Sequence, residues 1–270
     1  MTVVPRRALA VTRIGFPPWA QSATGILLLA AAFEAVPQAG IVPTAYLPPL
    51  HQVLAALAGE AGRPLFWFSL YETLRGWAIG LAIAATAAIA TGLLIGTVPF
   101  LRTATSSTIE FLRPIPSVAL IPLAVLLFGA DLRSKLLLIV YASFWQVLIQ
   151  VLYGVQDVDP VARDTARSYR FSRWGRVRHV VWPTALPYVM TGLRLASAVA
   201  LVLAVTSELI IGAPGLGQQI ALAQSGGAVP DLYALVVVTG LVGIAINFLF
   251  RWAERRVLSW HPSVRGEATV

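Results

Sequence analysis

Residues 78–98 read AIGLAIAATAAIATGLLIGTV, a stretch without any Asp, Glu, Lys or Arg side chain. A helix needs roughly 20 mainly apolar residues to cross about 30 Å of hydrocarbon. Only helices and closed barrels satisfy every backbone hydrogen bond in lipid, and barrel strands alternate apolar and polar side chains over about ten residues. The unbroken apolar stretch therefore predicts a membrane-spanning helix and, with it, an all-α membrane protein.

The composition of the whole chain agrees with this prediction. Apolar residues make up 57% and charged residues 12% of the 270 residues, and the mean hydropathy is +0.76. Soluble globular domains contain about 25% charged residues. The composition is therefore typical of a chain that folds in lipid, and it excludes a disordered, collagen-like or coiled-coil protein.

Several kinds of chemistry are excluded by the residues that are missing. The absence of cysteine removes disulfide scaffolds, thiolate metal sites and cysteine nucleophiles. The single lysine, Lys135, follows Ser134 and does not complete a GxxxxGK[ST] phosphate-binding loop, so we expect this chain to bind no ATP. His51, His179 and His261 fall in separate segments without an HExxH pattern. We therefore expect no metal site, no cofactor and no enzymatic activity.

Further apolar stretches of spanning length predict a polytopic protein. Six transmembrane helices are expected at approximately residues 22–38, 76–98, 107–128, 134–154, 186–211 and 231–251. They form a single transmembrane domain over residues 22–251, between an N-terminal segment at residues 1–21 and a tail at residues 252–270. The first stretch also resembles a signal peptide, because arginines precede a short apolar run. We expect it to be retained, and its cleavage would leave the other five spans oriented as they are.

The arginines indicate the orientation of the spans, because basic residues concentrate in cytoplasmic loops. With the N-terminus inside, the cytoplasmic segments hold Arg6, Arg7, Arg13, Arg102, Arg163, Arg167, Arg170, Arg173, Arg176, Arg178, Arg251, Arg255, Arg256 and Arg265. The outer segments hold only Arg63, Arg133 and Lys135, and three arginines lie in or beside spans. This asymmetry predicts that both termini and the loop at residues 155–185 face the cytoplasm. Since the arginines follow topology, nucleic acid is not an expected partner.

Two outer connections have a predicted structure of their own. Within the outer excursion at residues 39–75, Leu50, Val53, Leu54 and Leu57 have the spacing of an amphipathic helix. The last outer loop holds a cluster of helix breakers, Gly212, Pro214, Gly215 and Gly217, which is expected to end the fifth span.

The cytoplasmic loop at residues 155–185 predicts two short helices. Asp159 is a candidate N-cap with Pro160 at the first helical position, and this helix should end near Tyr169. Ser172 should cap a second helix that ends before Pro183. The two helices form a basic knob that suits either anionic lipid headgroups or an acidic groove on a partner protein.

The residues of this loop resemble a known pattern. Asp164, Thr165 and Ala166, followed by Val180 and Pro183, have the spacing of the EAA loop of bacterial ABC importer permeases. Other stretches resemble the nitrate, sulfonate and taurine branch of these binding-protein-dependent permeases: residues 73–75 with Gly80, 112–117, 128–129, 185–188, 191–196, and Glu208 with residues 215–217. The resemblance covers roughly residues 70–258.

The resemblance implies a fold, partners and a cargo. The expected fold is that of a type I ABC importer permease in the inner membrane, with a second permease copy, two ABC ATPase subunits that hydrolyse ATP with Mg, and an extracytoplasmic substrate-binding protein. The residues implied to contact the ATPase are Asp164, Thr165, Ala166, Arg167, Ser168, Tyr169, Arg170, Phe171, Ser172, Arg173 and Pro183. The implied cargo is a small anion such as a sulfonate, taurine or nitrate, among which this chain does not choose.

The loop departs from the family pattern at one backbone position. Arg170 stands where the family has a glycine between the two loop helices. That glycine permits a left-handed turn, which costs another residue roughly 1 to 2 kcal/mol. The sequence therefore predicts either a different turn or an acidic partner that offsets the strain at Arg170. Asp164 for Glu and Thr165 for Ala are milder departures.

Charged and proline residues inside the predicted spans are candidates for the translocation path, because buried charges in lipid are costly. Glu110 and Arg113 share a helical face and are expected to form a local ion pair. The tentative path or gate residues are Glu208, Pro114, Pro116 and Arg194, and for Glu208 a structural bond to the following loop is an equal alternative. The prolines should break the third span and expose its backbone to protein or a wet cavity.

A secondary transporter or channel that does not use ATP is the main alternative function. Such proteins are often built from paired halves with broken helices, and no internal repeat of this kind is visible here.

Overall fold

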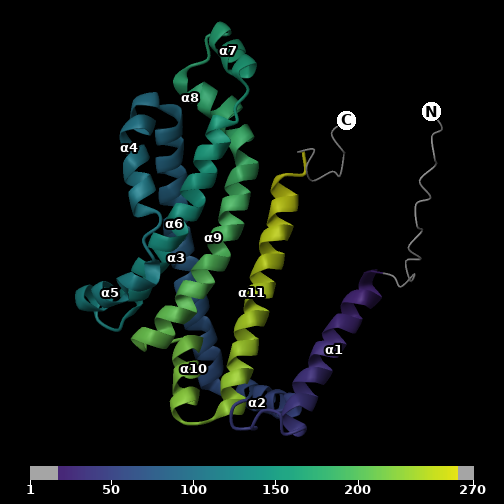
Figure 1. Cartoon of the computed structure of the whole chain (residues 1–270). Helices are drawn as coiled ribbons and strands as arrows, with labels where there is room; N and C mark the ends of the chain where they lie inside the picture. The colour runs from purple at the N-terminus through teal and green to yellow at the C-terminus, as the bar shows by residue number, and fades with distance from the viewer. Residues whose placement is uncertain (1–17, 261–270) are drawn as a thin grey trace, which may run out of the picture. The chain divides into compact units, whose positions relative to one another are not determined.

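The computed structural model describes residues 18–260, and it is helical throughout these residues apart from turns and short connections (Figure 1). The fold divides into two compact units, Met1–Ala55 and Ala56–Val270. Arg6, Arg7, Arg13, His261 and Arg265 lie outside the described residues.

The first unit contains one helix of spanning length, α1 (Pro18–Gln38), which confirms a helix at the first predicted span. The side chains of Ile26, Leu27, Leu28 and Leu29 are largely exposed. Near its end, the Glu34 carboxylate accepts a hydrogen bond from the backbone nitrogen of His51 at 3.1 Å and lies 2.8 Å from His51 Nδ1. The expected amphipathic helix is also present, as α2 (Leu50–Ala61).

The core of the second unit is a layer of three helices. The central helix α6 (Leu132–Gln156) packs against α3 (Pro64–Thr97) on one side and α9 (Trp182–Ile211) on the other. The side chains of Leu138, Val147 and Val151 in α6 are completely buried. The predicted fourth span is thereby confirmed with nearly the expected bounds.

Glycines on α3 allow its backbone to approach α6 closely. A Cβ atom on Gly80 would lie 2.5 Å from Ile139 Cγ2, and one on Gly92 would lie 2.7 Å from Val151 Cγ1. Small residues at such contacts increase van der Waals packing, which is a main source of helix association in lipid.

The second predicted span, approximately residues 76–98, lies within a longer helix. Helix α3 begins at Pro64, so residues 64–75 of the expected outer excursion are helical as well. Pro64 occupies the first turn, where its fixed φ and missing N–H are tolerated. Within this part of the helix, Arg75 pairs with Glu72 at 3.1 Å.

The third predicted span is broken, as its prolines indicated. Helix α4 (Pro99–Leu112) and the following short helices, a 3-10 turn at Ser117–Leu120 and α5 (Ile121–Phe128), meet at an angle of 81°. The expected helix at residues 107–128 is therefore two helices, and α4 begins earlier than predicted. Pro114 and Pro116 both lie in the break.

The glycine cluster ends α9 as expected. Gly212 caps this helix in the left-handed conformation with φ +79°, and its N–H donates to the Glu208 carbonyl. Helix α10 (Leu216–Ser225) then turns back and packs on α9, and α11 (Val229–Val257) packs on both. Among residues 18–260, five helices are long and apolar enough to cross a membrane, or six spans if α4 and α5 form one bent span.

Candidate functional site

The predicted knob forms at one end of the second unit, which we call the knob end (Figure 1). Its first helix is α7 (Pro160–Ser168), and Asp159 caps it by accepting a hydrogen bond from Val161 N at 2.8 Å. Its second helix is α8 (Arg173–Arg176), where Ser172 Oγ accepts from Gly175 N at 3.0 Å. Both predicted caps are confirmed.

The turn between α7 and α8 is left-handed at Arg170. Its φ is +56°, the single positive value at a non-glycine residue in the part of the chain that the structure describes. The turn is closed by Phe171 N, which donates to the Ala166 carbonyl at 3.0 Å, and by Arg170 N, which donates to the Arg167 carbonyl at 2.9 Å. The turn is therefore not a different one: it keeps the left-handed conformation at Arg170, and these bonds close it.

The knob continues into a membrane-spanning helix without a break. A π-helical segment (Val177–Val181) joins α8 to α9, and Pro183 lies in the first turn of α9. The predicted end of the second helix before Pro183 was therefore wrong, whereas the fifth predicted span, approximately residues 186–211, lies within α9. The wider π turn changes the hydrogen-bond register, so a proline without an N–H fits inside a continuous helix.

Most of the predicted contact residues of the knob are exposed on its surface. Ala166 is buried and Pro183 partly buried, whereas Asp164, Thr165, Arg167, Ser168, Tyr169, Arg170, Phe171, Ser172 and Arg173 are exposed. The aromatic side chains of Tyr169 and Trp174 are 76% and 72% exposed. Arg167 lies 3.3 Å from Asp164, an exposed ion pair of the kind that contributes less than about 1 kcal/mol.

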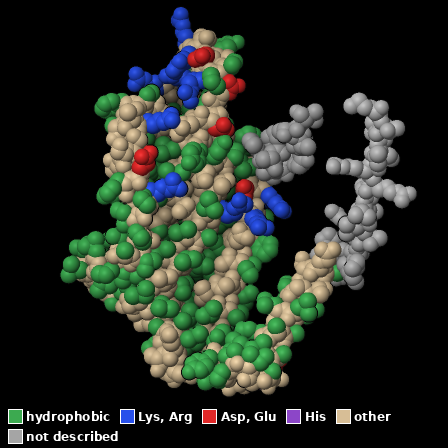
Figure 2. Space-filling model, in the orientation of Figure 1, with side chains coloured by type: hydrophobic (Ala, Val, Ile, Leu, Met, Phe, Trp, Pro, Cys, Tyr) green, Lys and Arg blue, Asp and Glu red, His purple; other side chains and the backbone are tan. Residues whose placement is uncertain are grey.

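Figure 2 shows Arg side chains gathered at the knob end of the bundle, because the single lysine, Lys135, is buried. They include the arginines of α7 and α8 and, near the end of α11, Arg251, Arg255 and Arg256. A basic surface with exposed aromatic side chains is chemically suited to an acidic partner with apolar pockets.

The opposite end of the second unit holds a buried ion pair that sequence reasoning missed. Lys135 Nζ in α6 lies 2.7 Å from Glu208 Oε1 in α9, and the side chains are 1% and 0% exposed. The same ammonium donates to the Glu72 carbonyl at 3.0 Å and to the Pro214 carbonyl at 3.3 Å. All three ammonium protons have acceptors. Lys135 is therefore not an outer loop charge, as its place in the predicted topology implied.

The Glu208 carboxylate connects this ion pair to the glycine turn. Its Oε2 atom accepts hydrogen bonds from Thr73 Oγ1 at 2.8 Å and from Gly217 N at 3.0 Å. Thr73 Oγ1 in turn accepts from Leu216 N at 2.9 Å. Of the two predicted roles for Glu208, the structural bond to the loop is the one that the structure shows.

Glycine is required where the turn passes over this carboxylate. Gly215 has φ +155°, and a Cβ atom there would lie 2.0 Å from Glu208 Cδ. The only sequence signals for the network were the single lysine in an apolar chain and the acidic residue just before a glycine cluster. Neither signal identifies the partner, because the two residues lie 73 positions apart.

Arg194 lies beside an acidic residue of another helix. Its Nη1 atom is 3.1 Å from Glu254 Oε2, so this pair joins α9 to α11. The side chains are 37% and 22% exposed. The sequence predicted neither this partner nor the pairing.

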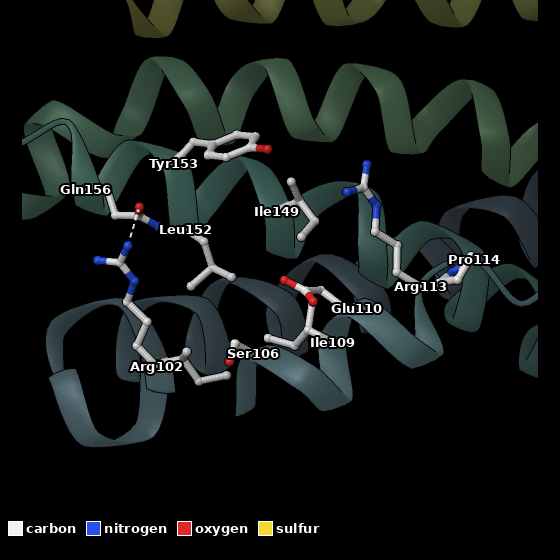
Figure 3. Close-up of a pocket in the computed structure, with 11 residues that line it drawn as sticks. Arg102, Ser106, Ile109, Glu110, Arg113, Pro114, Ile149, Leu152, Tyr153 and Gln156 are labelled. Atoms are coloured by element: carbon white, nitrogen blue, oxygen red, sulfur yellow. Dashed lines mark hydrogen bonds between the residues drawn. The ribbon is translucent and has the colours of Figure 1, made fainter. Parts of the chain in front are cut away.

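A groove of about 520 Å³ lies between α4 and α6 on the knob side of the break (Figure 3). We call it the α4–α6 groove, and it is lined by Ile95, Arg102, Ser106, Ile109, Glu110, Arg113, Pro114, Ile149, Leu152, Tyr153 and Gln156. Arg102 donates to the Gln156 side chain at 2.8 Å. Pro114 lies in its wall, and Pro116 does not line it.

The predicted ion pair between Glu110 and Arg113 was wrong. Within residues 18–260, neither side chain forms an ion pair. Arg113 is the C-cap of α4 and is followed directly by the proline break. Figure 3 shows its side chain and that of Glu110 extending separately from α4 towards the groove.

Comparisons with known proteins agree with these features. The family described as "Binding-protein-dependent transport system inner membrane component" matches residues 53–259. The taurine transport system permease protein TauC of Escherichia coli (strain K12) is 33% identical over 230 residues, which are 83% of this chain and 84% of TauC. The nitrate import permease protein NrtB of Leptolyngbya laminosa is 29% identical over 194 residues, 72% of this chain and 69% of NrtB.

A solved structure supports the same assignment of fold. It is a bacterial alginate ABC transporter in complex with alginate pentasaccharide-bound periplasmic protein. One of its chains matches with a TM-score of 0.63, covering 89% of this chain and 98% of that chain at 14% identity. At this identity the likeness shows a shared fold.

Proposed function

Because the chain belongs to the family of binding-protein-dependent transport system inner membrane components, we propose that it forms a cargo path driven by separate ATPase subunits. It has the all-α fold of type I ABC importer permeases and is a multi-pass membrane protein. The chain binds no ATP itself, and ATP and Mg are used by the partner ATPase.

The knob is the surface that couples ATP hydrolysis to the cargo path. The observation that carries this proposal is the unbroken helix from α8 through the π segment into α9. A partner that grips the exposed side chains from Asp164 to Arg173 and moves the knob also moves a spanning helix. Rigid connections of this kind transmit a two-state change from one element to another.

The knob end is cytoplasmic, and both termini lie on the same side. Support comes from the arginines that gather at the knob end and at the end of α11, because basic residues concentrate on the cytoplasmic side. The basic surface can also contact anionic lipid headgroups, which contribute roughly 1 kcal/mol per arginine near the membrane surface.

The cargo is a small anion that an extracytoplasmic binding protein delivers. Support comes from the names of the relatives, a taurine permease and a nitrate permease, and from the periplasmic protein in the alginate transporter structure. A second copy of this chain completes the path, since a chain with six spans and only 270 residues favours a homodimer around a shared path.

The test is transport by the purified complex in proteoliposomes. Uptake of radiolabelled taurine or nitrate should require ATP and the binding protein, and it should survive a protonophore. In this cysteine-free chain, Ser168→Cys with a photoactivatable thiol crosslinker should capture the ATPase, whereas Thr86→Cys within α3 should not. Uptake that survives ATP depletion but collapses with the protonophore would establish the secondary transporter instead, and crosslinks to lipid alone would refute coupling through the knob.

A further inference from the structure

Three charged side chains line the α4–α6 groove without neutralising one another. Arg102 and Glu110 lie on α4 and Arg113 is its C-cap, and no ion pair involves them among the residues that the structure describes. Glu110 and Arg113 lie within the third predicted span, where charges are costly unless they are paired or face water or a ligand, and Arg102 lies on the predicted cytoplasmic side of that span. Their shared position on the groove is therefore a reason to expect a charged ligand there.

The spacing of these charges along α4 limits what the ligand is. With a rise of 1.5 Å per residue, Arg102 and Arg113 lie about 16 Å apart along the helix axis, and Arg102 is nearer the knob end. Glu110 and Arg113 are three residues apart, so their Cβ atoms are separated by about 5 to 6 Å. The deep part of the groove thus offers one positive and one negative group at the length of a short carbon chain.

The other wall of the groove supplies contacts for such a chain. Ile149 and Leu152 of α6 are apolar, and Tyr153 and Gln156 continue this wall towards the knob end (Figure 3). Ligand sites commonly combine an apolar wall with a few placed polar groups that fix orientation. Two or three methylene groups would lie against the apolar wall.

We propose that the α4–α6 groove binds a small zwitterion, with its oxyanion against Arg113 and its ammonium against Glu110. Arg102 attracts the ligand at the mouth nearer the knob. A guanidinium pairs well with a sulfonate or carboxylate, because its N–H groups form a planar fork. A simple anion would gain from the arginines but would be repelled by Glu110, whereas a zwitterion matches all three charges. This inference rests on the proposed function and narrows its cargo, because among a simple sulfonate, taurine and nitrate only taurine carries both an oxyanion and an ammonium group.

Thiol labelling tests the charge of the groove. The chain has no cysteine, so Ser106→Cys places a single thiol on the groove wall. Ser107→Cys is the matched control, because Ser107 is the next residue of α4 and does not line the groove. The complex with its ATPase is labelled in detergent, where both ends are accessible, with methanethiosulfonates that carry either a sulfonatoethyl or a trimethylammonioethyl group.

The expected result is a higher ratio of anionic to cationic labelling rate at position 106 than at position 107. At position 106 the charges of Arg102 and Glu110, each four residues away, nearly cancel, which leaves Arg113 about 10 Å away along the helix axis. One positive charge at about 10 Å in water changes each rate about twofold, so the two ratios should differ by up to about fourfold. Equal ratios at the two positions would overturn the proposal.

Competition with two probes of the same size tests the zwitterion. Taurine should slow labelling at position 106 at least threefold more than isethionate, which has a hydroxyl in place of the ammonium. Glu110→Gln should remove the difference between the probes, and Arg113→Gln should remove protection by both, while Arg113→Lys should retain part of it. Each variant must still copurify with the ATPase, which excludes misfolding as the cause. Equal protection by both probes in the unaltered groove would overturn the proposal.

The labelling experiment uses no ATP and is therefore separable from the proposed function. Failure of the unaltered complex to import any sulfonate or nitrate with ATP would refute the proposed function, whatever the labelling pattern. ATP-driven uptake together with an unselective groove would refute only the groove proposal.

Discussion

Replacing Lys135 with methionine should destabilise the protein strongly, because it removes one partner of a buried ion pair. Methionine keeps the length of the side chain but not its charge. The loss leaves the Glu208 carboxylate, which is 0% exposed, without its ammonium partner, and it removes one hydrogen-bond donor from each of the Glu72 and Pro214 carbonyls. Breaking a buried ion pair from one side costs about 3 to 5 kcal/mol.

The assay is thermal unfolding in detergent, followed by the fluorescence of the chain's tryptophans. For a chain of this size 1 kcal/mol shifts Tm by roughly 2 °C, so Lys135→Met should lower Tm by about 6 to 10 °C. Arg133→Met is the control, since Arg133 is exposed in the same helix turn and surface substitutions usually change stability by less than about 0.5 kcal/mol.

The double variant Lys135→Met with Glu208→Gln separates the ion pair from general damage to the core. If the two side chains interact, the loss in the double variant should be smaller than the sum of the two single losses by about 1 to 3 kcal/mol. Additive losses, or a Lys135→Met variant that melts within 1 °C of the control, would refute the reasoning.

Three further substitutions test other features. Arg170→Gly should raise Tm by about 2 °C, because it removes roughly 1 kcal/mol of strain from the left-handed conformation. An unchanged Tm would contradict this strain. ATP-driven uptake should fall in the same variant if Arg170 contacts the ATPase. Gly215→Ala should lower the free energy of unfolding by about 1 to 3 kcal/mol or more, because the alanine Cβ would clash with the Glu208 carboxyl group. Gly240→Ala is the control: its Cβ would have open space, so Tm should stay the same or rise. Arg194→Gln should lower stability by no more than about 1 kcal/mol in the same melting assay, since its ion pair is partly exposed.

The knob and the Lys135–Glu208 ion pair lie at opposite ends of the same helix, so the stability tests also bear on transport. The knob is joined to α9, and α9 carries Glu208 near its far end. The ion pair with Lys135 therefore ties the end of this helix to α6, while the knob connects its other end to the proposed ATPase contact. A variant that loosens the ion pair without unfolding the bundle should lower the uptake driven by each ATP hydrolysed.

Local features of the fold were predictable from sequence because they depend on near neighbours. The N-caps at Asp159 and Ser172, the helix end at Gly212 and the left-handed turn at Arg170 each involve hydrogen bonds within a few residues. The break at the prolines was also predictable, but its angle of 81° was not, because the packing of α5 on α6 sets it.

The sequence by itself determined that this chain is a helical membrane protein of the importer permease family with a basic two-helix knob. Apolar length, capping residues and the spacing of a motif are properties of contiguous residues, so they are visible without a structure. Only the tertiary structure decided that Lys135 meets Glu208, that Arg194 meets Glu254, and that Glu110 and Arg113 face a groove instead of each other. These outcomes depend on which helix faces come together, because a charge in an apolar helix needs a partner that only the packing of distant segments can supply.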